Sequence, residues 1–137
     1  MKKIMLLLFI TMCSCKNDPK DQDVTMDTEN EPKEILEFRL SNKTELELYD
    51  ITIRLPDTVL AYKTLQKQSQ TEWIKVKSAY SYGSVEFFDI EKRQYNIQPI
   101  DYVGEELHEK GKMEFIIESI DTLKQNFELN SNYSAEE

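Results

Sequence analysis

Apolar residues of this chain recur at every second position, in short segments separated by polar turn residues. Residues 36–40 (LEFRL) and 113–117 (MEFII) show this alternation near the two ends of the chain body. Side chains two positions apart lie on the same face of a strand, so each segment predicts a strand with one buried face. No segment shows the spacing of a long amphipathic helix, which restricts the chain to folds built from strands.

The alternation predicts roughly seven or eight strands. They cover residues 36–40, 46–55, 58–65, 73–76, 85–90, 95–97, 113–117 and 127–129. The phase slips by one residue at Tyr49-Asp50 and again between Phe87 and Phe88, and such a slip within a strand predicts a β-bulge. Short strands at this spacing favour an all-β fold, an antiparallel β-sandwich of immunoglobulin-like size, with a small β-barrel as the alternative.

The first 14 residues have the composition of an export signal. Two lysines precede an apolar run, residues 4–10 (IMLLLFI), which is shorter than the roughly 20 residues that a membrane span needs. Signal peptidases require a small side chain directly before the cleavage site. Ser14 before Cys15 meets this requirement, whereas Met12 before Cys13 does not. We therefore expect Cys15 to be the first residue after cleavage.

Residues 12–16 (MCSCK) resemble the lipobox of bacterial lipoproteins. The resemblance implies a diacylglyceryl group on the sulfur of Cys15 and acylation of the new N-terminus. Each buried CH₂ group contributes about 0.8 kcal/mol to membrane binding, so two or three acyl chains anchor a protein stably. Residues 16–18 (KND) resemble the Lys-plus-acid signal that directs Bacteroidota lipoproteins to the outer surface. The prediction is a lipid-anchored cell-envelope protein of the outer membrane; the alternative is an ordinary cleaved signal with a chance cysteine.

The sequence predicts one folded domain between two disordered segments. Residues 16–33 are polar and almost without apolar side chains, so they cannot bury enough surface to fold. The predicted order is a signal peptide at 1–14, a tether at 15–33, a β-sandwich domain at 34–130 and a disordered tail at 131–137.

Composition argues against several classes of function. The net charge of −9 disfavours nucleic acid as a partner, because neutralising phosphates requires clustered Lys and Arg. Both cysteines lie at positions 13 and 15, so the chain body has no disulfide and no thiol nucleophile. His108 is the only histidine, and no nucleophile or phosphate-loop motif accompanies it. We therefore predict that the protein is not an enzyme and uses no cofactor.

Three motifs of the chain body resemble a group of small, uncharacterised Bacteroidota lipoproteins. They are the Tyr-x-Tyr segment at 80–82, the corner at 98–105 (QPIDYVGE) and the segment at 111–115 (GKMEF). In that group a Tyr-x-Tyr strand precedes a Pro-Ile-Asp-Tyr-x-Gly-Glu corner, and a Gly-Lys-x-x-aromatic strand follows it. The resemblance covers residues 38–129 and supports the predicted fold and location. It implies no activity.

Four tyrosines concentrate around the hairpin predicted within residues 79–107: Tyr80, Tyr82, Tyr95 and Tyr102. Aromatic rows on a sheet face bind sugars or peptides, because the ring supplies apolar area and the hydroxyl supplies orientation. These tyrosines are therefore the candidate binding surface. The alternative is ordinary cross-strand packing, which aromatic residues favour in any sheet.

Asp101, Glu105, Glu106 and His108 cluster in one predicted loop. Asp101 and Glu105 are the oxygen ligands that a Ca²⁺ site in this loop would use, but their spacing does not match an EF-hand. The alternative is a solvated loop in which Asp101 caps the corner at Pro99. We therefore predict no metal site.

Three further features concern the surface of the domain: the single tryptophan, the lysines near one predicted edge and two glycosylation sequons. Trp73 is the only tryptophan, and we expect it to anchor the core, with an exposed contact residue as the alternative. An open edge of a sandwich accepts a partner strand, and Lys75 and Lys77 are placed to guard one edge. The segments 42–44 and 132–134 match the glycosylation sequon, which carries no weight in a bacterial lipoprotein.

These observations favour a non-catalytic interaction module that is held at the membrane through lipid on Cys15. An envelope protein, a peptide or a glycan is the expected partner. The alternative is a lipoprotein inhibitor of a hydrolase that inserts the acidic loop at 101–109 into a basic cleft. A third hypothesis is an enzyme that uses Asp101, Glu105 and His108.

Overall fold

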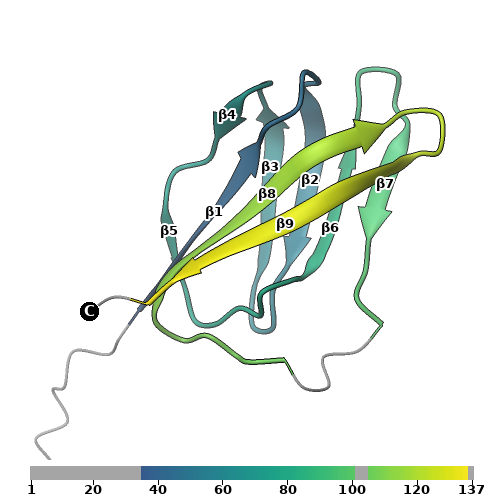
Figure 1. Cartoon of the computed structure of the whole chain (residues 1–137). Helices are drawn as coiled ribbons and strands as arrows, with labels where there is room; N and C mark the ends of the chain where they lie inside the picture. Colours follow the sequence, from purple (N-terminus) through teal and green to yellow (C-terminus); the bar gives the residue numbers. More distant parts are fainter. Residues whose placement is uncertain (1–34, 101–104, 136–137) are drawn as a thin grey trace, which may run out of the picture. The chain divides into compact units, whose positions relative to one another are not determined.

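The computed structural model describes residues 35–100 and 105–135, and these residues form strands and no helix (Figure 1). The strands are β1 (Leu36–Asn42), β2 (Leu48–Arg54), β3 (Val59–Leu65), β4 (Ser69–Gln70), β5 (Ile74–Val76), β6 (Ser84–Phe88), β7 (Gln94–Ile97), β8 (Gly111–Asp121) and β9 (Asn126–Ser134). The predicted all-β class is confirmed. The predicted export signal, Cys15 and tether lie outside the described residues.

The strands form two sheets that pack face to face. The first sheet has the order β4-β1-β8-β9, and β5 pairs with the same edge of β1 as β4. The second sheet has the order β3-β2-β6-β7. Two separate sheets make a sandwich, so the barrel alternative is wrong. One pair departs from the predicted antiparallel pattern: β1 and β8 run parallel, with Leu36 opposite Gly111.

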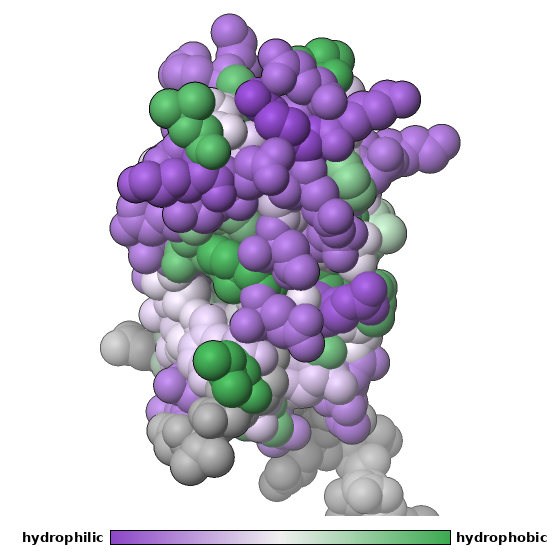
Figure 2. Space-filling view, turned by 90° about the vertical axis from the view of Figure 1, so that its right-hand side faces the viewer, coloured by the Kyte–Doolittle hydropathy of each residue, from purple (hydrophilic) through white to green (hydrophobic). Residues whose placement is uncertain are grey.

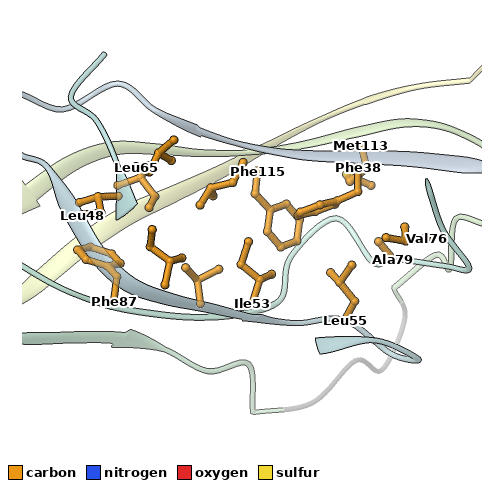
Figure 3. Close-up of a cluster of buried hydrophobic side chains, with 14 of the residues drawn as sticks. Phe38, Leu48, Ile53, Leu55, Leu65, Val76, Ala79, Phe87, Met113 and Phe115 are labelled. Carbon is orange, nitrogen blue, oxygen red and sulfur yellow. The ribbon is translucent and has the colours of Figure 1, made fainter. Parts of the chain in front are cut away.

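The core lies between the sheets and follows the alternation of the strands. In β1 and β8 every second side chain points inward, and Phe38 and Phe115 are fully buried with their rings 5.0 Å apart. Phe87 of the second sheet contacts Phe127 of the first, with ring centroids 4.8 Å apart. Figure 3 shows that side chains from both sheets fill this space. Burial of these apolar side chains is the main force that holds the sheets together.

One predicted bulge is confirmed. The pairing of β2 with β6 shifts between Tyr49 and Thr52, so β2 contains one extra residue. Asp50, within this bulge, has a φ of 46°. The extra residue reverses which side chains of β2 face the core, and it allows the segments on both sides to bury apolar residues.

The second predicted bulge, between Phe87 and Phe88, is wrong. The register between β6 and β7 is continuous from Val85 to Phe88. Val85, Phe87 and Asp89 all point inward, because the carboxylate of Asp89 finds hydrogen-bond partners there. Phe88 therefore stays on the outer face of the second sheet, and Ile90 is 73% exposed.

The domain extends past its predicted end. Residues 131–137 were expected to be a disordered tail, but β9 continues to Ser134 and pairs with β8 as far as Lys112. The segment at 69–70, which lies between the strands predicted at 58–65 and 73–76, pairs with the end of β1 as β4. Both segments are polar, and backbone pairing does not need apolar side chains, so alternation gave no signal there.

Position 83 has room only for glycine, because the ring of Phe115 packs closely against its backbone. A Cβ atom at position 83 would lie 2.9 Å from Cε2 of Phe115 and 3.3 Å from the carbonyl oxygen of Arg54. We expect Gly83→Ala to lower the free energy of unfolding by about 1–3 kcal/mol, because the buried ring has to move. Urea unfolding of Gly83→Ala, Phe115→Leu and the double variant measures this. Leucine removes the ring atoms that clash, so the two losses should not add; additive losses would contradict the contact.

Candidate binding site

The structure does not bring the four candidate tyrosines together on one surface. Tyr95 is fully buried, its ring stacks on Phe87 at 5.0 Å, and its hydroxyl donates to Asp89 at 3.0 Å. It is a core residue, and its assignment to an exposed surface is wrong. Tyr80 and Tyr82 are half-buried in the segment between β5 and β6. Tyr102 lies outside the described residues.

Asp89 holds the turn between β6 and β7. Its Oδ1 accepts the amide hydrogens of Glu91 at 2.9 Å and Arg93 at 3.0 Å. Its Oδ2 accepts from Nε of Arg93 at 2.7 Å and from the hydroxyl of Tyr95. Burial alone raises the pKa of Asp89, but these hydrogen bonds outweigh it and hold the pKa below the usual range. Four hydrogen bonds to Asp89 therefore hold the turn, and Ile90 within it is exposed to solvent.

A hollow of about 410 Å³ lies on the outer face of the second sheet beside this turn. Its lining residues are Tyr49, Asp50, Phe88, Asp89, Ile90 and Lys92. We call it the Phe88 hollow. Tyr49 and Phe88 are direct partners across β2 and β6, so their half-buried side chains form its floor. The Tyr49 hydroxyl donates to Glu47 at 2.9 Å, and this hydrogen bond raises the pKa of Tyr49.

The Phe88 hollow combines an apolar floor with charges of both signs. Asp50 and Lys92 are exposed and line it, and both adopt a positive φ, 46° and 61°. Non-glycine residues in this conformation each cost about 1 kcal/mol, which the bulge and the turn impose. Such a surface can take up an apolar side chain and form polar contacts with the backbone around it.

Among the described residues, the large hydrophobic side chains with high exposure are Ile35, Val59, Ile90, Ile100, Leu107 and Leu123. On the side of the molecule seen in Figure 2, hydrophobic residues form separate patches among hydrophilic ones. Ile90 differs from the others because it lies in a concave surface beside two aromatic rings, those of Tyr49 and Phe88. The sequence alone did not predict this site, although two apolar residues out of phase with the core, Phe88 and Ile90, were a signal for it.

The loop at 105–110 is held by its histidine. The backbone of His108 exchanges two hydrogen bonds with Ala79, both 2.9 Å. The ring of His108 stacks on Tyr133 at 3.8 Å, and its Nε2 lies 3.2 Å from the hydroxyl oxygen of Ser81. The imidazole is therefore an anchor for the loop, and Glu105 and its acidic neighbours remain exposed.

The described residues show neither a metal-binding cluster nor a membrane-spanning helix. The described residues contain no group of three or more His, Cys, Asp or Glu side chains placed to hold a metal ion. Glu105 is exposed, whereas Asp101 lies outside the described residues. No helix that is long and apolar enough to cross a bilayer occurs in the described part of the chain.

Trp73 does not anchor the core, so that prediction is wrong. It precedes Ile74, which pairs with Phe38 on the inner side, and therefore points to the outer face of the first sheet. The guanidinium of Arg39 lies 4.3 Å from the centroid of its ring, and the ammonium of Lys112 lies 5.6 Å away. Stacking of cations on the indole covers much of the ring.

The same face carries a half-buried acidic group, the carboxylate of Glu114. Nε of Arg39 lies 2.9 Å from Oε1 of Glu114, which also accepts a hydrogen bond from Ser41. Burial raises the pKa of Glu114, but the hydrogen bonds from Ser41 and Arg39 outweigh burial and lower it. Arg39, Ser41 and Glu114 satisfy one another, which makes this face a less suitable binding surface than the Phe88 hollow.

No family model and no curated protein matches the chain. Among solved structures it is similar to "NMR structure of the protein from Eubacterium rectale", with 13% sequence identity and a TM-score of 0.49. The aligned region covers 77% of this chain and 93% of that chain. The fold assignment therefore rests on the strands and sheets described above.

Proposed function

We propose that the chain is a lipid-anchored, non-catalytic binding module of the cell envelope, at the outer membrane. Its binding site is the Phe88 hollow, and its ligand is an apolar side chain of a protein or peptide partner. The observation that carries this proposal is the grouping of Tyr49, Phe88 and Ile90 outside the core, beside a turn that Asp89 fixes. Aromatic residues in a preformed hollow lose little entropy on binding.

The lipid anchor is supported by the lipobox-like segment around Cys15. Metabolic labelling with an alkyne fatty acid tests it. We expect Cys15→Ser to abolish labelling and to release the protein from the membrane fraction. Cys13→Ser is the matched control and should keep both. Equal labelling of the two variants would exclude Cys15 as the acylated residue.

Photo-crosslinking in living cells tests the binding site. A photoreactive residue in place of Ile90, 73% exposed, should give one discrete adduct with an envelope protein. Val59, 59% exposed and on the edge strand β3, is the control position and should give none. Tyr49→Ala should reduce the adduct at position 90. The same adduct from both positions, or none from position 90, would refute a binding role for the hollow.

One observation favours the alternative of a hydrolase inhibitor. Leu107 is 42% exposed between exposed glutamates, on the loop that the buried His108 anchors. A fixed loop with an exposed apolar residue fits the way such inhibitors enter a cleft. A panel of hydrolases assayed with micromolar protein tests it, with Leu107→Gly as the control variant. Hydrolases that are unaffected throughout would eliminate this function.

A further inference from the structure

We propose that two copies of this chain pair through residues 130–134 of β9, antiparallel and about a two-fold axis. We call these residues the β9 edge. The pairing would join the first sheets of the two copies into one continuous sheet. It uses neither the Phe88 hollow nor the lipid anchor, and it is therefore independent of the function proposed above.

The β9 edge is open in the described part of the chain. β9 is the last strand of the first sheet, and among residues 35–100 and 105–135 it pairs only with β8. Ser131 lies opposite the fully buried Phe115, on the core side of the sheet, and yet it is exposed. In contrast, Phe127 at the start of β9 is buried against Phe87. Figure 1 shows that β9 starts near β7 and ends away from it, beside β8.

The other sheet edges in the described residues are protected. β3 carries the exposed Lys63 near its middle, and β5 is short and carries Lys75. β4 has two residues, and β7 has four and is followed closely by Pro99. Short strands, lysines and prolines are among the devices that prevent edge pairing. β9 has nine residues and contains none of them, so its edge is the one suited to pairing.

The chemistry of the β9 edge favours a second copy over another partner. Its sequence, NSNYS, carries no charge, although the chain has a net charge of −9. Within residues 130–134, two acidic copies therefore place no carboxylates opposite one another. A two-fold axis at Asn132 pairs that residue with its equivalent and Asn130 with Ser134 of the second copy. The side chains of asparagine and serine both donate and accept hydrogen bonds, so facing copies of these residues can bond to one another across a two-fold axis.

Oxidative crosslinking in living cells tests the pairing at its predicted centre. Asn132→Cys should form a disulfide-linked dimer at least tenfold more abundant than the dimer of Asn96→Cys. Asn96 is the matched control, because it is also an exposed asparagine on an edge strand, β7. The unsubstituted chain controls for Cys13 and Cys15. A disulfide between position 132 and a different protein would overturn self-pairing.

A second measurement does not depend on the register. Ser131→Lys places an ammonium on the core side of the edge, where it reaches water in the monomer but becomes buried in the dimer. We expect the purified full chain carrying Cys15→Ser, which has no lipid, to shift toward twice the monomer mass in sedimentation at high micromolar concentration. Ser131→Lys should keep it monomeric, whereas Asn96→Lys should not. A monomer at all concentrations, or a dimer that Ser131→Lys leaves intact, would overturn the proposal.

Discussion

Asp89→Ala is expected to lower the free energy of unfolding by about 3–5 kcal/mol. Asp89 is 3% exposed, and its carboxylate accepts four hydrogen bonds, two from backbone amides and two from the side chains of Arg93 and Tyr95. Alanine leaves all four donors without their acceptor. The guanidinium of Arg93 also loses its buried counter-charge, and this loss exceeds that of a neutral hydrogen bond.

Urea unfolding followed by tryptophan fluorescence measures this loss. Glu91→Ala is the matched control, because Glu91 also lies near Arg93, 3.1 Å from Nη1, but its side chain is 65% exposed. An exposed ion pair contributes at most about 1 kcal/mol, so this variant should stay close to the wild type. Equal losses in the two variants would show that the Asp89 hydrogen bonds do not stabilise the turn.

The same carboxylate makes stability depend on pH. The pKa of Asp89 is lower in the folded chain than its ordinary value of about 4 in the unfolded chain. Its contribution is therefore complete above the unfolded-state pKa and is lost as the pH falls through the folded-state pKa. Glu114 and Asp121 shift in the same direction. As the pH falls, we expect the free energy of unfolding to decrease more steeply for the wild type than for Asp89→Ala. Urea unfolding across a pH series measures this, and the same pH dependence in both proteins would contradict the lowered pKa of Asp89.

The features that could be predicted from the sequence are those set by residues close together in the chain. Alternation located most of the strands because a half-buried strand shows its two faces directly in the sequence. The bulge at Tyr49 and Asp50 was visible for the same reason, as a slip of phase. The parallel pairing of β1 with β8 was not, because it joins segments far apart in the chain and nothing local encodes it.

The candidate site was misread where a polar residue occupies an inward position. Asp89 continues the phase of Val85 and Phe87, but a carboxylate is not expected in a core, so the pattern suggested a bulge. Only the partners of Asp89, brought in by the turn, make its burial favourable. Trp73 shows the opposite case, an apolar residue that was expected in the core and lies on the outer face. The cations that stack on its ring come from β1 and β8, so nothing near Trp73 in the sequence indicates them.

Asn42→Asp is expected to lower the free energy of unfolding by about 3–4 kcal/mol. Asn42 is fully buried at the end of β1. Its Nδ2 donates to the carbonyl oxygens of Leu46 at 2.8 Å and Gln66 at 3.0 Å, and its Oδ1 accepts from the amide and hydroxyl of Thr44. It therefore ties the loop after β1 to the turn after β3. Aspartate would replace the donor by an oxygen that faces two carbonyl oxygens.

Protonation of the new carboxyl restores one of the two donated hydrogen bonds, because a neutral acid has one hydrogen to donate. The loss from Asn42→Asp should therefore shrink as the pH falls below the pKa of the buried acid, which burial raises. Urea unfolding at neutral and acid pH measures both effects, with the exposed Asn96→Asp as the control. Asn96→Asp should change stability by less than about 0.5 kcal/mol. A loss at Asn42 that is no larger than this would mean that its amide does not connect the two loops.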